Sequence, residues 1–167
     1  VLNQSYNDFE IIVVDDNSKD NTWDILQKYQ KRHSKKIKIL KNKKKGACAA
    51  RNYGFKFSTG QFIQYLDADD ILSPNKIKNQ IRLFRENGSN IIVHGGYCRF
   101  YKNIDNLHFS KSEIDKNYQN PTDWLIDSWN NKGMGQTSIW ITPRKIIKKT
   151  NGWNESLLIN QDGEFFS

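Results

Sequence analysis

The sequence is poor in residues that mark several classes of protein. Its 167 residues include two cysteines, three prolines and one methionine. Cys48 and Cys98 are too few for a disulfide scaffold and form no metal-binding pattern, so we expect a reducing, cytoplasmic setting. No apolar run approaches the roughly 18 residues of a membrane-spanning helix, since the longest covers only residues 11–14. The three histidines are scattered, which argues against a zinc site.

Arginine is also scarce, with six residues against 20 lysines, although the net charge is +8. Lysine lacks the forked donor group with which arginine reads base edges, so the composition argues against specific nucleic-acid binding. Seven lysines gather in one stretch that we call the basic cluster: Lys35, Lys36, Lys38, Lys41, Lys43, Lys44 and Lys45. A solvated face is one interpretation of this cluster, and attraction to the anionic inner face of a cell membrane is the other.

Strands and helices are expected to alternate through the first half of the chain. The apolar run before Asp15 is continuous, which is typical of a strand covered on both faces. We expect Ser73 to cap the third helix, with Pro74 at its first position and Gly88 at its end. The expected strands are 9–16, 36–41, 61–66 and 90–93, and the expected helices are 23–32, 46–59 and 74–87. This order predicts an α/β sandwich with a mostly parallel sheet.

The second half of the chain, from about Gly95, is less regular. Its pattern predicts a helix at 121–129, a strand at 137–142 and a short helix at 143–147. Because no repeat or linker interrupts the sequence, we expect residues 1–167 to form one domain.

Acidic side chains follow two of the expected strands. Asp15 and Asp16 end the first strand, and Asp67, Asp69 and Asp70 follow the third. Since ligands bind at the carboxyl ends of strands in open α/β sheets, we expect both clusters on one rim. Positions i and i+2 of an extended chain point the same way, so Asp67 and Asp69 can share a divalent cation such as Mg²⁺ or Mn²⁺. The alternative is a solvated acidic turn with helix-capping aspartates.

Four segments, in order along the chain, carry a family resemblance. They read VLNQSYNDFEIIVVDDNSKDNT, GACAARNYG, TGQFIQYLDADD and NGWNESLLINQDGEFF. Together they closely resemble the family-2 glycosyltransferases, whose GT-A fold is a nucleotide-binding α/β/α sandwich. The resemblance implies a nucleotide-binding half at 1–94 and an acceptor-side half at 95–167, without the family's first strand and C-terminal continuation. The absent strand would lie between the strands ending at Asp16 and Asp67, so we expect those two strands not to be hydrogen-bonded to each other.

The resemblance also implies roles for residues of the first half. The pair Asp15 and Asp16 corresponds to the family's contact with the nucleotide base, with Asp16 favoured, and capping of a helix turn by Asp16 is the alternative. Arg51 and Asn52 correspond to a block beside the nucleotide. For Arg51 two interpretations stay open: it neutralises phosphate, or it forms a structural ion pair with Asp16 or Asp67.

The family's Asp-x-Asp motif corresponds to Asp67 and Asp69. The resemblance assigns Asp69 to the metal and Asp67 to the ribose, the metal or both, whereas we expect Asp70 to cap the following turn. A cation on the diphosphate would stabilise the charge that grows on the leaving group in the transition state.

The catalytic base of the family is an Asp or Glu near the end of the domain, often preceded by a second acid. Here Gln161 stands in place of the preceding acid. The base therefore falls on Asp162, with Glu164 as the next candidate. Helix N-capping is the alternative for Asp162.

Tryptophan offers a further class of candidate sugar contact. Trp153 lies in an expected turn near Asp162, so it is the best candidate for stacking on a sugar ring. An aromatic core is the default interpretation for Trp153, as it is for Trp124, Trp129 and Trp140.

Taken with the resemblance, these observations predict an inverting, metal-dependent glycosyltransferase. Its donor is expected to be a nucleotide-sugar, by resemblance a UDP-sugar, and its acceptor a hydroxyl of a saccharide or lipid-linked saccharide. The expected setting is bacterial cell-surface polysaccharide or glycolipid synthesis. The alternatives are a sugar nucleotidyltransferase on a similar sheet, and a non-catalytic basic module that binds nucleic acid or membrane.

Overall fold

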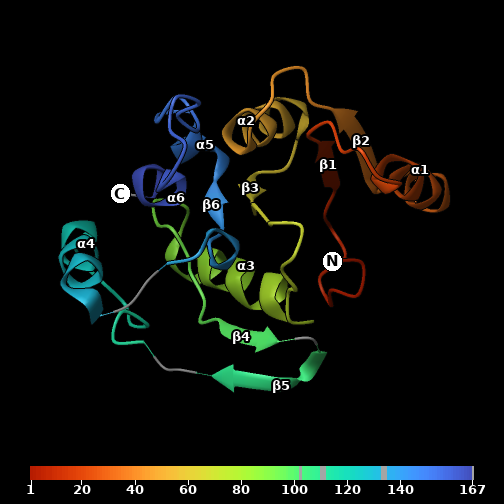
Figure 1. The fold of residues 1–167 in the computed structure, drawn as a ribbon. Coiled ribbons are helices and arrows are strands. Elements are labelled where there is room, and N and C mark those ends of the chain that lie inside the picture. The colour runs from red at the N-terminus through yellow and green to blue at the C-terminus, as the bar shows by residue number, and fades with distance from the viewer. Residues whose placement is uncertain (102, 110–111, 133–134, 167) are drawn as a thin grey trace.

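A computed structural model describes residues 1–101, 103–109, 112–132 and 135–166. The strands are β1 (Ile11–Asp15), β2 (Ile37–Lys41), β3 (Phe62–Ile63), β4 (Cys98–Tyr101), β5 (Asn103–Phe109) and β6 (Thr142–Pro143). The α-helices are α1 (Thr22–Arg32), α2 (Ala47–Phe57), α3 (Lys76–Asn87), α4 (Pro121–Asp127), α5 (Arg144–Ile147) and α6 (Gln161–Phe165). A π-helical turn (Ser128–Lys132) follows α4, and a 3₁₀ turn (Thr137–Ile139) precedes β6. Figure 1 shows β3 and β6 between α2 and α3, with the β4–β5 hairpin at the far edge.

The first two strands form the expected parallel pair. β1 and β2 run in register from Ile11 opposite Ile37 to Asp15 opposite Lys41, with α1 as the crossover between them. α2 approaches β1 closely because it carries Gly54, where a Cβ atom would lie 3.3 Å from Cγ2 of Val14. This unit places the carboxyl end of β1 beside the start of α2.

The prediction of a mostly parallel sheet is confirmed for β1 and β2 only. The pairs β3–β6 and β4–β5 are antiparallel, and Val93 forms an isolated antiparallel bridge with Ile141. β1 and β3 belong to different sheets, and within the described residues no hydrogen bond joins them, as we expected. The β3–β6 pair joins the first and second halves of the chain.

Three predicted strands are shorter in the structure, and side-chain amides donate to backbone carbonyls in these segments. The 61–66 segment keeps only two strand residues, and Gln64 Nε2 donates to the carbonyls of Tyr65 and Ser138. Gln80 Nε2 donates to the carbonyls of Val93, at 3.3 Å, and Ile139, at 2.9 Å. The predictions of full strands at 61–66, 90–93 and 137–142 were therefore wrong.

The start of α3 also differs from the prediction. Residues 74 and 75 form a turn, and the helix begins at Lys76, whose N–H donates to the carbonyl of Ser73. The N-terminal segment caps this end instead of Ser73: Gln4 Oε1 accepts the N–H of Ile77, and Gln4 Nε2 donates to the Ser73 carbonyl. Gly88, with φ of 79°, ends the helix as expected.

The buried apolar residues form two clusters. One packs the faces of α3 and β6 together through Leu72, Ile77, Ile81, Phe84, Val93 and Ile141. The other joins α2, β3, α5 and α6 through Cys48, Ile63, Tyr65, Ile147, Trp153 and Phe165. The second cluster fixes the C-terminal segment, including α6, against the elements that carry the acidic residues of the first half.

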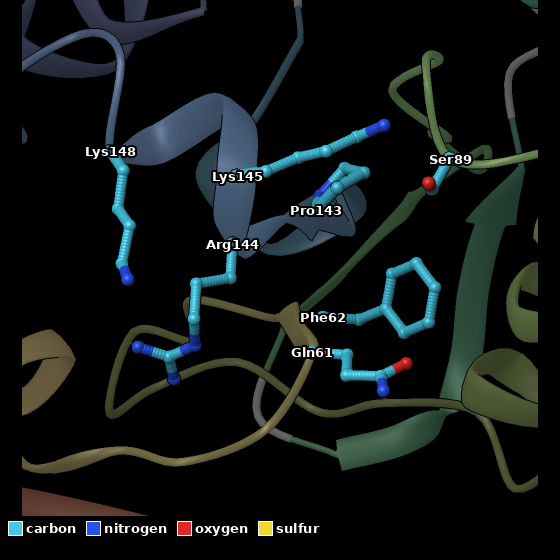
Figure 2. A pocket seen from close by; sticks show the side chains of 7 residues that line it. All are labelled: Gln61, Phe62, Ser89, Pro143, Arg144, Lys145 and Lys148. Carbon is cyan, nitrogen blue, oxygen red and sulfur yellow. The ribbon is translucent and has the colours of Figure 1, made fainter.

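A pocket of about 310 Å³ opens beside the β3–β6 pair (Figure 2). Its lining is basic and apolar: Gln61, Phe62, Ser89, Pro143, Arg144, Lys145 and Lys148. The guanidinium of Arg144 donates to the Gly60 carbonyl and Ser58 Oγ, and Lys145 Nζ lies 2.7 Å from Asn90 Oδ1. Two of the three cations of this pocket therefore hold the protein's own backbone and side chains.

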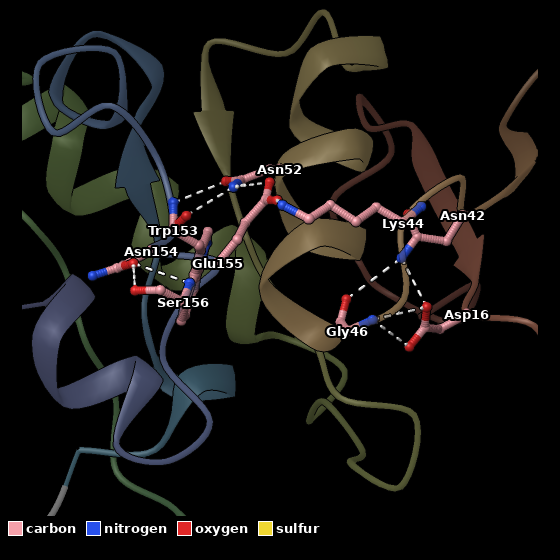
Figure 3. A network of polar contacts seen from close by, with 9 residues as sticks. All are labelled: Asp16, Asn42, Lys44, Gly46, Asn52, Trp153, Asn154, Glu155 and Ser156. Atoms are coloured by element: carbon pink, nitrogen blue, oxygen red, sulfur yellow. Dashed lines mark hydrogen bonds and ion pairs between the residues drawn. The ribbon is translucent and has the colours of Figure 1, made fainter.

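The segment before α6 is held on α2 by a single asparagine side chain (Figure 3). Asn52 Oδ1 accepts the N–H of Trp153 at 2.8 Å, and Asn52 Nδ2 donates to the Trp153 carbonyl at 2.8 Å and to Glu155 Oε1 at 3.0 Å. Lys44 Nζ pairs with the other carboxylate oxygen of Glu155 at 2.5 Å. The hydrogen bond from Asn52, followed by that from Lys44, lowers the pKa of Glu155. We call this set of contacts the Asn52 clasp.

Lys76 is a partly buried lysine whose amine, among the described residues, contacts amides and no carboxylate. Its Nζ donates to the amide oxygens of Gln64 and Gln80, the latter at 2.5 Å. Burial lowers the pKa of Lys76 from 10.5 to about 7, because the charged form loses hydration that two neutral amides only partly replace. The two glutamines that the amine joins also donate to the backbone carbonyls of Tyr65, Val93, Ser138 and Ile139.

We predict that this lysine makes the protein more stable as the pH rises from about 7 to 9. In that window the unfolded chain holds the Lys76 proton and the native protein does not, so the free energy of unfolding increases with pH by at most about 1.4 kcal/mol per unit. Lys76→Met should lose this part of the slope. Urea unfolding of both proteins at pH 7, 8 and 9 measures it. An equal slope in both proteins would show that Lys76 keeps an ordinary pKa in the fold.

We predict that Gly152→Ala destabilises the protein through the Asn52 clasp. Gly152 has φ of +81°, and its added Cβ would lie 2.6 Å from Asn52 Oδ1. Gly88→Ala is the matched control, since Gly88 has φ of +79° but no atom within 4 Å of an added Cβ. The control should lose about 1–2 kcal/mol from backbone strain, and Gly152→Ala at least about 1 kcal/mol more from the lost clasp. Equal losses in urea unfolding would contradict a role for this close contact.

Candidate functional site

Asp67 and Asp69 lie in a turn just beyond β3. The N–H of Asp70 donates to the carbonyl of Asp67 at 3.2 Å, so residues 67–70 turn back instead of continuing the strand. The expectation that Asp67 and Asp69 face one point from an extended chain was therefore wrong in its geometry. Asp69 is exposed, and the Asp67 side chain is 39% exposed. Both carboxylates are accessible to a ligand on one short turn.

Asp70 holds this turn onto the second half of the chain. Its Oδ2 accepts hydrogen bonds from Gln136 Nε2, at 2.6 Å, and from Ser138 Oγ. The prediction that Asp70 caps the following turn was wrong, because its carboxylate reaches a segment more than 60 residues later in the chain. The position of the Asp67 turn thus depends on the 136–138 segment.

Asp15 and Asp16 end β1 with different partners. Asp15 is buried and its Oδ1 accepts the N–H of Ser18 at 3.1 Å. Asp16 accepts hydrogen bonds from Asn42 Nδ2, at 2.8 Å, and from the N–H of Gly46 (Figure 3). Asp16 therefore binds the first residue before α2, a capping contact that belongs to a different helix from the one after β1. Its contact with a nucleotide base stays a prediction.

Arg51 joins the two acidic parts of the molecule. Its Nη2 lies 2.8 Å from Asp67 Oδ1, and its Nη1 donates to Gln161 Oε1 at 3.1 Å. The guanidinium carbon lies 4.4 Å from the centre of the Trp153 ring, and the Arg51 side chain is only 17% exposed. Of the two interpretations of Arg51, the structure contains the ion pair with Asp67. The contact with phosphate is untested.

Asp162 lies in the first turn of α6, directly after the partner of Arg51. Asn160 occupies the N-cap position of this helix, so Asp162 is not the N-cap. Its Oδ1 accepts the neighbouring Gly163 N–H. Glu164 lies on the same short helix. The Arg51–Gln161 contact places the Asp162 turn near the Asp67 turn, although the two are nearly a hundred residues apart in sequence. Asp162 as the base stays a prediction.

Sequence reasoning missed the roles of Gln161 and of the Asn52 side chain. The oxygen of the Asn52 side-chain amide binds residue 153 and its nitrogen binds residues 153 and 155, so Asn52 organises the protein beside the rim. A direct contact between Asn52 and a nucleotide is untested. Gln161 was noted only as a departure from the family's usual acid. A signal was present in the sequence, since the Arg-Asn pair on one helix and the Trp-Asn-Glu run in a turn are both rich in paired donors and acceptors.

Of the two interpretations of Trp153, the structure supports the aromatic core and not sugar stacking. Trp153 is 2% exposed, and Phe165 stacks on it with ring centres 4.0 Å apart. Tyr65 packs edge-on at 5.1 Å. With these neighbours and Arg51 around the ring, no face is open to a sugar. Trp129 is the exposed ring among the four candidates, with 74% exposure.

We call the carboxylates of Asp67 and Asp69 the acidic rim. They suit a cation whose other ligands come from water and substrate. Within the described ranges, no group of three histidine, cysteine, aspartate or glutamate side chains could hold an ion. Asp67 and Asp69 supply two carboxylates, and one oxygen of Asp67 is paired with Arg51. Magnesium commonly binds one or two carboxylates together with water and substrate phosphates, so these residues fit a cation that arrives with a diphosphate. They do not form a site for a strongly held free ion.

The basic pocket beside β3 and β6 lies away from this rim. It is lined by residues at the start of β3, whereas Asp67 follows the other end of that segment, and no carboxylate lines it. The carboxylates of the acidic rim are thus accessible to solvent. No helix in the described part of the chain is long and apolar enough to cross a membrane.

Curated relatives match about half of the chain. A glucosyltransferase of Escherichia coli named UDP-Glc:alpha-D-GlcNAc-diphosphoundecaprenol beta-1,3-glucosyltransferase WfaP is 46% identical over 80 residues, which is 48% of this chain and 31% of the relative. The E. coli enzyme of the same description named WfgD is 40% identical over 99 residues, 58% of this chain and 37% of the relative. The matched regions thus span little more than a third of these relatives.

Solved structures show the same fold. TarS residues 1–349 from S. aureus, crystallised with UDP, superposes with a TM-score of 0.75 and 22% identity, over 98% of this chain and 47% of that one. The mannosyltransferase PcManGT from Pyrobaculum calidifontis, in complex with GDP-Man and Mn²⁺, gives a TM-score of 0.66 with 14% identity, over 96% of this chain and 43% of that one. The expected α/β fold of the GT-A type is confirmed.

The family model described as "Glycosyl transferase family 2" matches residues 1–151. This range covers most of the chain, including the β1–β2 unit, the Asp67 turn and Arg51. The chain therefore belongs to glycosyltransferase family 2.

Proposed function

We propose that this domain transfers a sugar from a nucleotide donor to a hydroxyl acceptor, with inversion at the anomeric carbon. The observation that carries the proposal is the bridge made by Arg51, which bonds Asp67 at 2.8 Å and Gln161, the neighbour of Asp162, at 3.1 Å. Sugar transfer needs a group that stabilises charge on the leaving diphosphate and, on the other side of the sugar, a group that accepts the proton of the acceptor hydroxyl. Family membership supports this activity and argues against a sugar nucleotidyltransferase or a nucleic-acid module.

The donor is a UDP-sugar in this proposal. Two relatives carry names that specify UDP-Glc, and a structural neighbour was crystallised with UDP. Asp16 lies at the carboxyl end of β1, where ligands of open α/β sheets bind, and is assigned to the base. Asp67 is assigned to the ribose or the metal.

A divalent cation, Mn²⁺ or Mg²⁺, is assigned to Asp69 and Asp67 together with the diphosphate. When bound, it supplies positive charge to the leaving nucleoside diphosphate. The neighbouring mannosyltransferase was solved with GDP-Man and Mn²⁺, which supports a divalent ion but not a particular one. Asp70 keeps these two carboxylates in place by anchoring their turn to Gln136 and Ser138.

In the transfer step the acceptor oxygen attacks the anomeric carbon as the bond to the diphosphate breaks. Asp162 must be ionised, and its carboxylate takes the proton from the acceptor hydroxyl. The nucleoside diphosphate leaves with the bonding electron pair, close to the positive charge of Arg51. Attack from the side opposite the leaving group inverts the anomeric configuration.

The acceptor is proposed to be a lipid-linked saccharide of a bacterial cell-surface polysaccharide or glycolipid pathway. The names of the two E. coli relatives specify an acceptor linked to diphosphoundecaprenol. Six lysines of the basic cluster are exposed, and the ammonium groups of Lys36, Lys38, Lys41 and Lys43 lie over aromatic rings. Exposed lysines near an anionic lipid surface each contribute about 1 kcal/mol of attraction. These features support peripheral contact of the protein with the inner face of the membrane.

We predict that Asp69→Ala abolishes metal-dependent UDP binding. Wild type should bind UDP in the presence of Mn²⁺ and at least about tenfold more weakly in EDTA, because two carboxylates and a diphosphate share the ion. Asp8→Ala is the matched control, since Asp8 is exposed and lies at the opposite, amino end of β1. Calorimetry with UDP and Mn²⁺ is the measurement. Wild-type affinity in Asp69→Ala would remove this residue from the metal site.

We predict that Asp162→Asn lowers turnover by about 10²–10⁴-fold in the intact protein, the usual contribution of a positioned base. Asparagine preserves the size of the side chain and its acceptor for the Gly163 N–H, so stability and UDP affinity should stay close to wild type. Glu164→Gln is the companion variant. Turnover that survives Asp162→Asn but is lost in Glu164→Gln would move the base to Glu164.

A further inference from the structure

The guanidinium of Arg51 occupies a carboxylate that the proposed function needs for a cation. Asp67 Oδ1 lies 2.8 Å from Arg51 Nη2, which is a direct, charge-assisted contact. A cation bound to Asp67 would be repelled by a guanidinium at this distance. Arg51 and an incoming ion therefore compete for the negative charge of the same carboxylate.

Two other contacts hold Arg51 in place without neutralising it. Gln161 Oε1 accepts its Nη1, and the ring of Trp153 lies below the guanidinium at 4.4 Å. Gln161 is itself anchored, because its Nε2 donates to the Leu157 carbonyl at 2.9 Å. Gln161 and Trp153 are both uncharged, whereas Asp67 forms an ion pair with Arg51.

We propose that Arg51 is a resident counter-cation, which pairs with Asp67 in the free protein and transfers to the diphosphate when a metal–nucleotide complex takes Asp67. Gln161 is the positioning residue that keeps the guanidinium at the rim during this exchange. The inference rests on the proposed function. It adds to it that Arg51 pairs first with Asp67 and then with the diphosphate. The neutral side chain at 161 is essential to it, because a carboxylate there would retain Arg51 after Asp67 is taken.

This exchange makes two affinities move in opposite directions when Arg51 loses its charge. Without Arg51 the carboxylates of Asp67 and Asp69 are uncompensated, so Mn²⁺ alone should bind more tightly. The diphosphate, however, loses a cationic partner, so UDP in the presence of saturating Mn²⁺ should bind more weakly. A merely structural role for Arg51 would weaken both.

The test uses Arg51→Met, whose unbranched side chain can still pack on Trp153. Relative to wild type, we expect affinity for Mn²⁺ alone to rise about three- to tenfold, measured by electron paramagnetic resonance of the free ion. Affinity for UDP with Mn²⁺ should fall about tenfold or more, measured by calorimetry. Mn²⁺ affinity that is unchanged or lower in Arg51→Met overturns the inference, whatever UDP does.

Two further variants separate the ion pair from general charge and from folding. Lys44→Met removes a cation that pairs with Glu155 and not with Asp67, so Mn²⁺ affinity should not rise. An equal rise in Lys44→Met would reduce the effect to net charge and overturn the inference. Arg51→Lys keeps the charge, and should return Mn²⁺ affinity toward wild type. The urea midpoint of each variant identifies any that is unfolded.

The positioning role of Gln161 is tested by a double-mutant cycle. Gln161→Leu should weaken UDP·Mn²⁺ binding about threefold or more in the presence of Arg51 and have no effect in Arg51→Met, because it acts through the guanidinium. Additive effects would contradict that role. If wild type binds Mn²⁺ but no UDP, the proposed function fails, while the Mn²⁺ comparison still reports whether Arg51 shields Asp67.

Discussion

The attachment of the C-terminal segment to α2 is the constraint on which the rest of the site depends. Two adjacent residues of one helix make it. Asn52 holds the backbone of Trp153 in both directions, and Arg51 reaches Gln161. The Trp153 ring then packs beneath Arg51 and against Phe165. Because α6 has only five residues and little stability of its own, these contacts determine where Asp162 lies.

Hydrogen bonds from polar side chains link the segments in the centre of the molecule. The side-chain amides of Gln64 and Gln80 donate to backbone carbonyls of neighbouring segments, and Lys76 donates to both of their amide oxygens. Asp70 extends the same arrangement to the Asp67 turn through Ser138. The acidic rim is thus supported by a hydrogen-bonded set of buried groups, each of which would be costly to leave without a partner.

Much of the fold could be predicted from local pattern. The apolar run ending at Asp15, the alternating segment before Lys41 and the amphipathic face of α3 have the periodicities of their elements, and their bounds agree closely with the structure. The segments around Gln64 and Val93 could not be predicted, since their apolar runs favour strands and their side-chain hydrogen bonds reach other parts of the chain. The acidic residues were found by their positions at strand ends, whereas the roles of Gln161 and the Asn52 clasp depend on contacts across about 100 residues.

We propose that the Asp67 turn and the Asp162 helix face one bound nucleotide. Paramagnetic broadening of backbone amide resonances by Mn²⁺ in the presence of UDP, with Mg²⁺ as the diamagnetic reference, tests it most directly. We expect the strongest broadening at Ala68 and Gly163 together, with Ser89 at the basic pocket much less affected. Broadening centred on Ser89 and Lys145, or confined to Ala68 while Gly163 stays sharp, would contradict it.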